Sequence, residues 1–593
     1  MSVETISQLF INTIRSYPKD NLLMFKKEGR YVSLSSRDVW DRVRFLSLGL
    51  RALGLQPRDK LIILSENCPD WVMTDFAALC AGATTVPIYP TLMPEQIKYI
   101  INDSDAKVVV CSTRELWHKV ESVRKDLTKV THAILFEDTA PEGVLTLAGI
   151  IAKGKAVAGG GRDDFEKTAL GIHPGELASI IYTSGTTGVP KGVMLTHANI
   201  VHNIKSLRAI VEFKDTDVIL SFLPLSHVLE RMCTFAFLYV GATIAYAESI
   251  ETVGENLVEA RPTIMVSVPR LFDKIYAKVI DQVLAGPALK KKIFFWAVRV
   301  GKKQGQMKLR GEPVTGWLKF RYGVAQKLVF SKILAKTGGR VRFFVSGGAP
   351  LSKDIAEFFY AAGLTVIEGY GLTETSPVIA CNTIEGVKFG TVGRPIPGVE
   401  VKIAPDGEIL TRGPNLMKGY YKKEAETREV LVDGWLHTGD IGTLDDAGFL
   451  VITDRKKDLI ITAGGKNVAP QPIENLLKTN PYIANAVVVG GNRKFISAII
   501  VPNFDKLEAY ARAGNIPFSS RRELAGREDV RDFLLAEVNR STPNLAPYER
   551  VKKIVLLDRD FEIEAGEITP TLKVRRSIVE QKYKGLIDTM YKE

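Results

Sequence analysis

From Ile181 to Asn199 the sequence reads Ile-Tyr-Thr-Ser-Gly-Thr-Thr-Gly-Val-Pro-Lys-Gly-Val-Met-Leu-Thr-His-Ala-Asn. The apolar residues before Thr183 predict the end of a strand, and residues 193–195 predict a second short strand. Between the two, glycines free backbone N–H groups to turn toward an anion, hydroxyls donate hydrogen bonds, and Lys191 adds a point charge. The stretch therefore predicts either a polyphosphate-binding loop or an ordinary flexible hairpin loop.

The spacing in this stretch differs from that of the Walker phosphate-binding loop. In the Walker loop, Gly-Lys-Ser/Thr opens a helix, whereas here Val-Pro separates Gly188 from Lys191. Pro190 and the β-branched valines near it disfavour a helix. We therefore expect strand, loop and strand in succession.

Composition limits the class of protein. The chain has 593 residues, 46% of them hydrophobic and 25% charged, which is typical of a folded protein with several cores. Its five cysteines are far apart and its seven histidines do not cluster, which favours free thiols in a reducing compartment over a structural zinc site. Residues 1–20 lack a secretory signal pattern, and no apolar run reaches the ~18 residues of a spanning helix.

Periodicity along the chain predicts the fold class. Residues from about 35 to 160 alternate helical and extended patterns, and this alternation resumes near Val218, which predicts an open, mostly parallel sheet. After Gly390, short strands with Gly and Pro turns predict a small antiparallel barrel or sheet. A domain boundary is expected at residues 454–458, followed by a compact α+β unit.

Three further motifs carry groups that suit a nucleotide. Residues 345–350, Val-Ser-Gly-Gly-Ala-Pro, form either a tight turn or a bare backbone platform for a planar ring such as adenine. Residues 368–375, Glu-Gly-Tyr-Gly-Leu-Thr-Glu-Thr, offer a ring, a hydroxyl and the carboxylate of Glu374, a ligand type that Mg²⁺ on ATP phosphates needs. Asp440 follows a turn and is suited to accept hydrogen bonds from ribose hydroxyls, with Arg455 nearby in sequence.

These motifs occur together and in order over nearly the whole chain, and they resemble the adenylate-forming enzymes, which include acyl-CoA synthetases, luciferases and peptide-synthetase adenylation domains. Within that superfamily the chain is similar to long-chain fatty acyl-CoA synthetases. This closer resemblance rests on three segments, residues 223–231 (Leu-Pro-Leu-Ser-His-Val-Leu-Glu-Arg), 267–272 (Ser-Val-Pro-Arg-Leu-Phe) and 569–573 (Thr-Pro-Thr-Leu-Lys), and on a long insert.

The resemblance implies an α/β fold. Its large N-terminal domain holds two open, mostly parallel sheets plus a small β-barrel, and its small C-terminal α+β domain is mobile. We expect the large ATP- and acyl-binding domain at residues 1–454 and the catalytic lid at 455–593. The basic helical insert is expected at about 276–340 and the β-rich subdomain at about 390–454.

The resemblance also implies the reaction and the roles of residues. A fatty acid attacks MgATP to give acyl-AMP and pyrophosphate, and the thiol of CoA then displaces AMP. Lys573 bridges the carboxylate and the α-phosphate, and no general base is required because the carboxylate is already ionised. The implied nucleotide and magnesium residues are Thr183, Ser184, Gly185, Thr186, Thr187, Gly188, Lys191, Gly347, Gly348, Ala349, Glu368, Gly369, Tyr370, Thr373, Glu374, Asp440 and Arg455, of which Ser184 and Glu374 serve the metal.

The second step of the reaction implies a rotation of the C-terminal domain. Lys457 matches the hinge position, Gly464 and Gly465 match the lining of the CoA channel, and His227 matches a position near the acyl carboxylate, although it also suits a packed core. The loop that begins at Ile461 is one residue longer than in some bacterial members. This length leaves the correspondences between it and Lys573 open.

The insert is strongly basic. Between Lys290 and Arg340 there are 14 lysines and arginines against one acidic residue, Glu312, with aromatic residues interleaved. This composition indicates either solvated helices packed on the body or contact with an anionic membrane surface, and no recognition motif supports nucleic-acid binding.

These observations predict a cytoplasmic enzyme, peripheral on the inner face of a membrane and monomeric or homodimeric. Two alternatives stay open. One is an acyl-AMP ligase that loads a carrier-protein thiol. The other is a catalytically silent protein that binds fatty acid and nucleotide.

Overall fold

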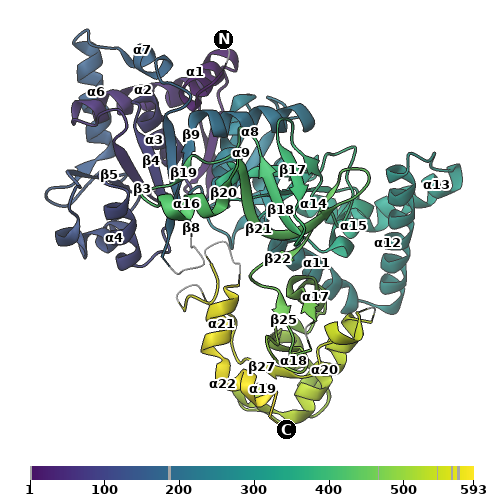
Figure 1. Ribbon diagram of the computed structural model, residues 1–593. Coiled ribbons are helices and arrows are strands. Elements are labelled where there is room, and N and C mark those ends of the chain that lie inside the picture. Colours follow the sequence, from purple (N-terminus) through teal and green to yellow (C-terminus); the bar gives the residue numbers. More distant parts are fainter. Residues whose placement is uncertain are drawn as a thin grey trace.

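The computed structural model describes residues 3–183, 189–464, 466–543, 545–562, 565–569 and 574–592. Two large sheets and one small sheet form the body, and a smaller unit made of the C-terminal residues lies below it (Figure 1). Within the described residues, no helix is both long and apolar enough to cross a bilayer.

The first large sheet contains the quoted stretch. Its eight strands lie in the order β19-β9-β8-β4-β3-β5-β6-β7, with β9 antiparallel to both β8 and β19 and the other neighbours parallel. Thr183 and Lys191 pair as β8 and β9 form an antiparallel hairpin, so the two predicted strands are confirmed, whereas residues 184–188 between them lie outside the described residues. The strands are β3 (Lys60–Leu64), β4 (Thr84–Ile88), β5 (Ala106–Cys111), β6 (His132–Leu135), β7 (Leu145–Thr146), β8 (Leu177–Thr183), β9 (Lys191–Thr196) and β19 (Gly419–Tyr420).

The second large sheet has nine strands in the order β16-β15-β14-β13-β12-β10-β11-β1-β2. The strands from β1 to β14 in this order are parallel, and the outer strands β2, β15 and β16 are antiparallel. They are β1 (Leu23–Lys27), β2 (Arg30–Leu34), β10 (Val218–Ser221), β11 (Thr243–Tyr246), β12 (Ile264–Ser267), β13 (Phe343–Ser346), β14 (Thr365–Gly371), β15 (Val378–Cys381) and β16 (Arg394–Pro395).

Helices cover the sheets and share one large apolar core with them. Two of them, α3 (Pro69–Cys80) and α9 (Val228–Tyr239), are buried almost all round, which explains why their sequences are apolar without a polar face. The others in this part are α1 (Ile6–Ser16), α2 (Ser36–Ala52), α4 (Pro94–Asp103), α5 (Arg114–Glu121), α6 (Leu147–Gly159), α7 (Phe165–Leu170), α8 (His197–Ile210), α10 (Val253–Ala260) and α15 (Lys353–Ala361).

A buried ion pair joins α3 and α9. Arg231 of α9 donates to both carboxylate oxygens of Asp75 of α3 at 2.6 and 2.8 Å, and the two side chains are 3% and 0% exposed. The same guanidinium donates to Ser179 of β8 at 2.5 Å and to Thr85 of β4 at 2.6 Å. One side chain thus ties a helix of the second sheet to two strands of the first.

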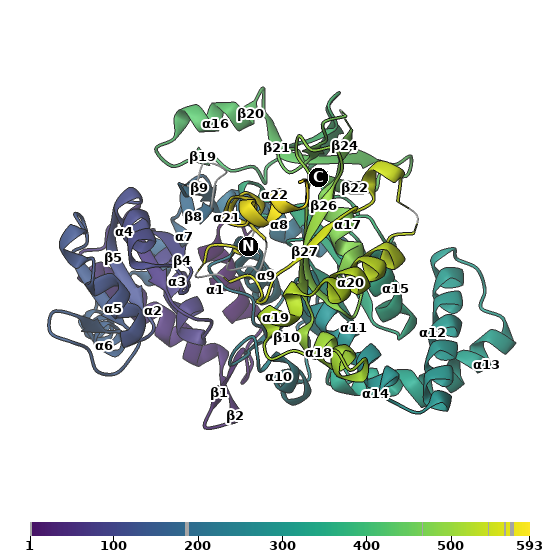
Figure 2. The same ribbon diagram turned by 90° about the horizontal axis from the view of Figure 1, so that it is seen from below.

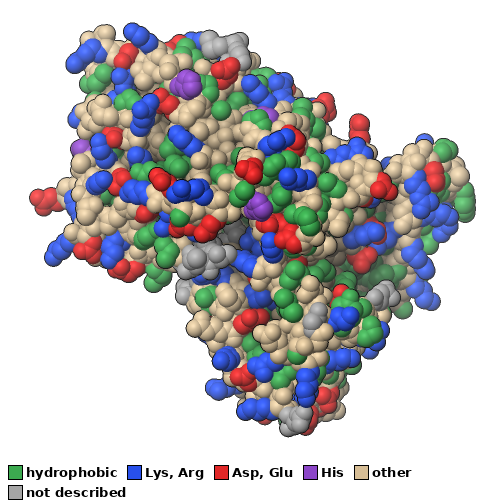
Figure 3. All heavy atoms as spheres, in the orientation of Figure 1, with side chains coloured by type: hydrophobic (Ala, Val, Ile, Leu, Met, Phe, Trp, Pro, Cys, Tyr) green, Lys and Arg blue, Asp and Glu red, His purple; other side chains and the backbone are tan. Residues whose placement is uncertain are grey.

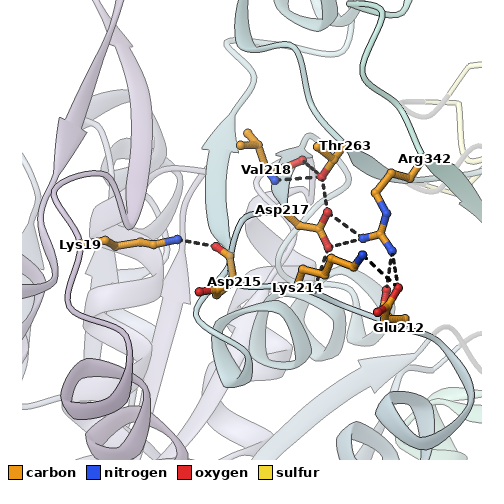
Figure 4. Close-up of polar contacts among 8 residues, drawn as sticks. All are labelled: Lys19, Glu212, Lys214, Asp215, Asp217, Val218, Thr263 and Arg342. Atoms are coloured by element: carbon orange, nitrogen blue, oxygen red, sulfur yellow. Dashed lines mark hydrogen bonds and ion pairs between the residues drawn. The ribbon is translucent and has the colours of Figure 1, made fainter.

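A second polar cluster lies at the amino ends of the parallel strands (Figure 4). Asp217, just before β10, accepts two hydrogen bonds from Arg342, just before β13, at 2.7 and 2.8 Å. Thr263, just before β12, donates to the same carboxylate at 2.7 Å. Because these groups satisfy one another at the end of the sheet opposite the strands' carboxyl ends, we assign them a structural role.

The small sheet is the antiparallel sheet predicted from the pattern after Gly390, and among the described strands it does not close into the barrel that the resemblance implies. Its described strands have an open order, β17-β18-β21-β20, with β22 also paired to β21. The ten-residue β21 pairs with β18 and β20 through its first half and mainly with β22 through its second, so the strands spread along it without closing. They are β17 (Glu400–Ile403), β18 (Glu408–Arg412), β20 (Leu431–Val432), β21 (Trp435–Leu444) and β22 (Leu450–Arg455), and α16 (Glu424–Val430) precedes β20.

The insert forms a helical projection. Figures 1 and 2 both show α12 and α13 at one side of the molecule, away from α1–α6. The predicted helices are confirmed. They are α11 (Pro269–Leu284), α12 (Ala288–Leu309), α13 (Gly316–Ala325), a π-helical segment (Gln326–Phe330) and α14 (Ser331–Lys336).

The residues after β22 have apolar clusters of their own. They contact α11 through ion pairs of Arg270 with Asp560 at 3.2 Å and of Asp281 with Lys506 at 2.7 Å. Their elements are β23 (Ile460–Ile461), β24 (Asn467–Val468), α17 (Pro470–Leu477), β25 (Ile483–Val489), β26 (Ser497–Pro502), α18 (Phe504–Ala513), α19 (Arg521–Gly526), α20 (Glu528–Ser541), β27 (Ile554–Leu556), α21 (Arg576–Lys582) and α22 (Lys584–Thr589).

The buried ion pair yields a stability prediction. Arg231→Met leaves the Asp75 carboxylate buried without its partner, so we expect the free energy of unfolding to fall by about 3–5 kcal/mol in denaturant titrations. Arg412→Met is the matched control, because Arg412 and its partner Glu400 are 49% and 60% exposed, and it should cost less than about 1 kcal/mol. Equal losses in the two variants would contradict the assignment.

Candidate functional site

The candidate site is built at the carboxyl ends of β13 and β14, where open parallel sheets bind ligands. After Ser346 the backbone turns through Gly347 and Gly348, and Gly348 has a positive φ of 82°. A Cβ at Gly347 would lie 3.0 Å from the Leu229 side chain and 3.8 Å from the carbonyl oxygen of Gly369. The bare backbone therefore lets the two strand ends and α9 approach one another closely.

Glu368 of β14 contacts the segment that follows this turn. Its carboxylate is buried and accepts a hydrogen bond from the backbone N–H of Leu351 at 3.3 Å. Burial raises the pKa of Glu368 to about 7. The contact fixes the segment 347–351 to β14, so the structure places Glu368 beside the predicted adenine platform.

Tyr370, Asp440 and Arg455 converge from three strands. The Tyr370 hydroxyl donates to one carboxylate oxygen of Asp440 at 2.7 Å, and Arg455 Nε lies 3.2 Å from the other. Burial and the Asp440 carboxylate raise the pKa of Tyr370, so its hydroxyl stays protonated. The group presents a ring, a carboxylate and a guanidinium, which suits an adenosine ribose.

Lys191, Glu374 and Tyr420 form a second group. Tyr420 donates to Glu374 Oε1 at 2.8 Å, and Lys191 Nζ lies 5.2 Å from the centre of the Tyr420 ring. Thr373 and Glu374 share a 3₁₀ turn (η3, Thr373–Thr375), and the backbone carbonyl of Glu374 accepts from Met417 at 2.8 Å. A cation, a hydroxyl and a carboxylate thus stand near the end of the β8–β9 hairpin.

Glu374 fits the magnesium role predicted from the sequence. Within the described residues, no group of three or more histidine, cysteine, aspartate or glutamate side chains is placed to hold a metal ion. Mg²⁺ that arrives on ATP phosphates needs only one or two protein carboxylates and keeps several waters. A single, half-buried Glu374 held by Tyr420 satisfies that requirement.

His227 stands at the N-cap of α9, where its Nδ1 accepts from the backbone N–H of Leu229 at 3.2 Å. The ring is partly exposed, not packed in the core. Because a Cβ at Gly347 would lie 3.0 Å from the Leu229 side chain, the start of α9 lies close to the platform, and His227 stands at that start. Its acyl-site role stays a prediction.

Glu230 and Tyr246 lie deeper in the protein interior than His227. Both are buried, one carboxyl oxygen of Glu230 and the Tyr246 hydroxyl have no hydrogen-bond partner within the described residues, and their side chains interact electrostatically. Burial raises the pKa of Glu230 to about 8. The acid therefore stays largely neutral near neutral pH, beside the position expected for an anionic substrate.

The remaining predicted residues lie in turns that follow β22 or outside the described chain. Lys457 is exposed in the turn between β22 and β23, and Gly464 is exposed in the β23–β24 hairpin. The predicted residues outside the described part of the chain are Ser184, Gly185, Thr186, Thr187, Gly188, Gly465 and Lys573.

Sequence reasoning missed Leu229, Tyr420, Glu230 and Tyr246. Tyr420 comes close to Lys191 because β19 pairs with β9 across more than 200 residues of sequence. No local pattern signals that pairing. Leu229 and Glu230 fall within the quoted segment 223–231, which pointed to this region without giving their roles.

Comparisons with known proteins identify the family. Residues 10–421 match the family described as AMP-binding enzyme, and residues 457–593 match the AMP-binding enzyme C-terminal domain. The chain is 37% identical to a protein of Mycobacterium bovis named long-chain-fatty-acid–CoA ligase FadD15, over 95% of this chain and 93% of that protein. It is 32% identical to long chain acyl-CoA synthetase 7, peroxisomal, of Arabidopsis thaliana, over 100% of this chain and 87% of that protein.

Solved structures confirm the predicted α/β fold with a large N-terminal and a smaller C-terminal domain. The anthranilate CoA ligase AuaEII, crystallised with anthranoyl-AMP, aligns with a TM-score of 0.74 at 18% identity over 98% of both chains. The adenylation domain of a carboxylate reductase from Mycobacterium chelonae aligns with a TM-score of 0.76 at 23% identity, over 99% of this chain and 91% of that one. At these identities the likeness concerns the fold alone.

The raised pKa of Glu230 gives a test by pH. Its ordinary value is 4.5 and the folded value is about 8, so the unfolded chain releases this proton first and stability falls as pH rises between the two values. Glu230→Gln removes this loss. We expect its stability advantage over the wild type to widen from about pH 5 to about pH 8 in thermal unfolding.

The exposed Glu385→Gln is the control for this series. Its unfolding curve should stay parallel to that of the wild type across the same pH range. A constant difference between Glu230→Gln and the wild type would show that Glu230 is ionised throughout.

Proposed function

Because this chain belongs to the AMP-binding enzyme family, we propose that it is a long-chain fatty acid–CoA ligase that uses ATP, Mg²⁺ and CoA. The observation that carries the proposal is the presence of two groups at the end of β14: Tyr370 of β14 binds Asp440 in the Tyr370–Asp440–Arg455 group, and Glu374 of the next turn binds Tyr420 in the Lys191–Tyr420–Glu374 group. Support for the substrate class comes from relatives above 30% identity that are named long-chain fatty acid–CoA ligases and are matched nearly end to end.

In the first step the residues position two anions that repel each other. Asp440 and Arg455 hold the ribose, Lys191 and Thr373 hold the phosphates, and Glu374 holds Mg²⁺, which would neutralise phosphate charge. Lys573 supplies the cation between the fatty acid carboxylate and the α-phosphate, where a fixed charge in a dry site acts most strongly. The acyl carboxylate attacks the α-phosphorus, pyrophosphate leaves, and acyl-AMP is formed.

In the second step the CoA thiol attacks the acyl carbon and AMP leaves. We assign Lys457, in the turn after β22, as the hinge about which residues 455–593 rotate, which carries Lys573 out and brings Gly464 and Gly465 to the CoA channel. Only a few residues need to change their backbone angles in such a hinge. The exposed position of Lys457 and Gly464 supports this assignment.

Product analysis distinguishes the proposal from its rivals. The protein is incubated with MgATP, CoA and a ladder of saturated and unsaturated acids, and the products are identified by mass. AMP, pyrophosphate and a long-chain acyl-CoA are expected, with a graded length preference because one methylene contributes only about 1–3 kcal/mol. Acyl-AMP without thioester would favour a carrier-protein acceptor, and no ATP consumption would favour a binding protein.

Lys573→Ala tests the first step. We expect the variant to bind ATP as the wild type does and to lose pyrophosphate release by about 10²-fold or more, because a charge that stabilises the transition state is removed. Lys584→Ala, at an exposed lysine of α22, should keep full activity. Full adenylate formation by Lys573→Ala would remove this mechanism.

We also infer that the enzyme works in the cytoplasm as a monomer or homodimer, bound peripherally to the inner face of a membrane. The insert supports this inference. Trp317 and Phe320 of α13 are 70% and 62% exposed, and their rings stack at 5.7 Å. Lysines and arginines gather on the same projection (Figure 3). Exposed rings among cations suit an anionic lipid surface.

The membrane inference is tested with vesicles. The protein should sediment with phosphatidylglycerol vesicles at low salt, less so at high salt, and little with phosphatidylcholine vesicles. Trp317→Ser with Phe320→Ser should reduce binding several-fold, whereas Val258→Ser on α10, where the side chain is 50% exposed, should not. Equal sedimentation with both lipids would contradict the inference.

A further inference from the structure

A cavity of about 210 Å³ lies between α12, α13, α15 and the start of β14. Thr365, the first residue of β14, lines it, whereas Glu368, Gly369 and Tyr370 occupy the middle and the carboxyl end of that strand. At about 3.3 Å per residue, Thr365 lies roughly 10 to 17 Å from them along the strand. The cavity is therefore separate from the site described above.

Glycines on the inner face of α12 shape this cavity. A Cβ at Gly305 would lie 2.8 Å from the Tyr360 ring, and one at Gly301 would lie 2.6 Å from the carbonyl oxygen of Ala361. Both glycines line the cavity. Their missing side chains let α12 approach α15 while the space beside Tyr360 stays open.

The cavity wall carries polar groups whose hydrogen-bonding capacity the protein leaves unused. Gln304 is only 7% exposed, and no hydrogen bond to its amide exists within the described residues. The hydroxyls of Tyr322 and Tyr360 also lack hydrogen bonds in the part of the chain that the structure describes. A ligand with several acceptor oxygens could accept hydrogen bonds from these groups.

The charge of the wall is positive. Lys308 stands at the rim and forms no ion pair with any described residue, whereas Lys302, one and a half turns earlier on α12, pairs with Asp354 at 3.5 Å and Glu357 at 3.1 Å. No acidic side chain is among the described residues that line the cavity. The wall thus offers an ammonium, an amide and two phenols, a set rich in hydrogen-bond donors.

We propose that this cavity binds the phosphate group of a small phosphate ester, a ligand beyond the proposed ligase reaction. Four donors that approach from three helices suit the several oxygens of a phosphate better than the two coplanar oxygens of a carboxylate. A lysine serves as the point charge. The ester comes either from the glycerophosphate headgroup of an anionic lipid under the basic insert or from a free metabolite.

Calorimetric titration with glycerol 3-phosphate tests the site, with adenosine, which carries no phosphate, present at saturation to cover the nucleotide site. We expect the wild type to bind and Lys308→Met and Gln304→Leu to bind at least tenfold more weakly. Lys303→Met is the matched control, because Lys303 is exposed on the same helix and does not line the cavity. It should bind as the wild type does.

Thermal unfolding establishes that each variant is folded. Where Gln304→Leu does not fold, Tyr322→Phe with Tyr360→Phe replaces it and should also weaken binding. No binding by the wild type, or equal binding by wild type, Lys308→Met and Lys303→Met, would overturn the proposal.

The source of the phosphate is then distinguished by competition. Phosphatidylglycerol vesicles that displace glycerol 3-phosphate from the wild type indicate a lipid headgroup. Failure of the vesicles to compete, with binding of the soluble ester retained, indicates a free phosphate ester. Both outcomes keep the cavity as a phosphate site.

Discussion

The buried contact of Arg231 with Asp75 is the constraint on which the arrangement of the site depends. It joins α9, which packs on strands of the second sheet, to α3 and to strands β4 and β8 of the first sheet. The guanidinium satisfies four acceptor atoms at once, so its desolvation is offset by hydrogen bonds as well as by charge. Through β8 it fixes the hairpin that leads to Lys191, and through α9 it fixes His227 and Leu229 in front of Gly347.

The two ends of the second sheet consequently differ in character. At the amino ends, Asp217, Thr263 and Arg342 satisfy one another and hold β10, β12 and β13 in register. At the carboxyl ends, Glu230, Tyr246 and Ser346 retain buried atoms without hydrogen-bond partners among the described residues. Unsatisfied polar groups are costly in a folded protein, and their concentration at one end is what a substrate site requires. This difference between the two edges follows from the parallel arrangement, because parallel strands bring their amino ends to one edge of the sheet and their carboxyl ends to the other.

The sequence predicts whatever depends on neighbours along the chain. Thr183 and Lys191 pair in one hairpin, and Asp440 and Arg455 pair in another, so their proximity follows from local pattern. Tyr420 reaches Glu374 only because β19 joins β9, and the Leu229–Gly347 contact requires α9 to lie against β13. Such long-range pairings leave no periodic signal. The pattern after Gly390 predicts either a barrel or a sheet, and strand periodicity does not decide between them, because it does not reveal that β21 pairs with different strands along its two halves.

The basic insert carries an excess of positive charge that ion pairs in the described part of the chain do not neutralise. Of its 14 cations between Lys290 and Arg340, only Lys302 and Arg310 form ion pairs in the described part of the chain. Uncompensated like charges destabilise a compact state, and exposed Trp317 and Phe320 add apolar surface to the same projection. Neither feature helps α12 to pack on α15. That packing relies on glycines and on buried Phe294, which lie on the inner face of the insert. The inner face of the insert therefore accounts for its folding, and the anionic surface that we propose as its partner would offset the charge of its outer face.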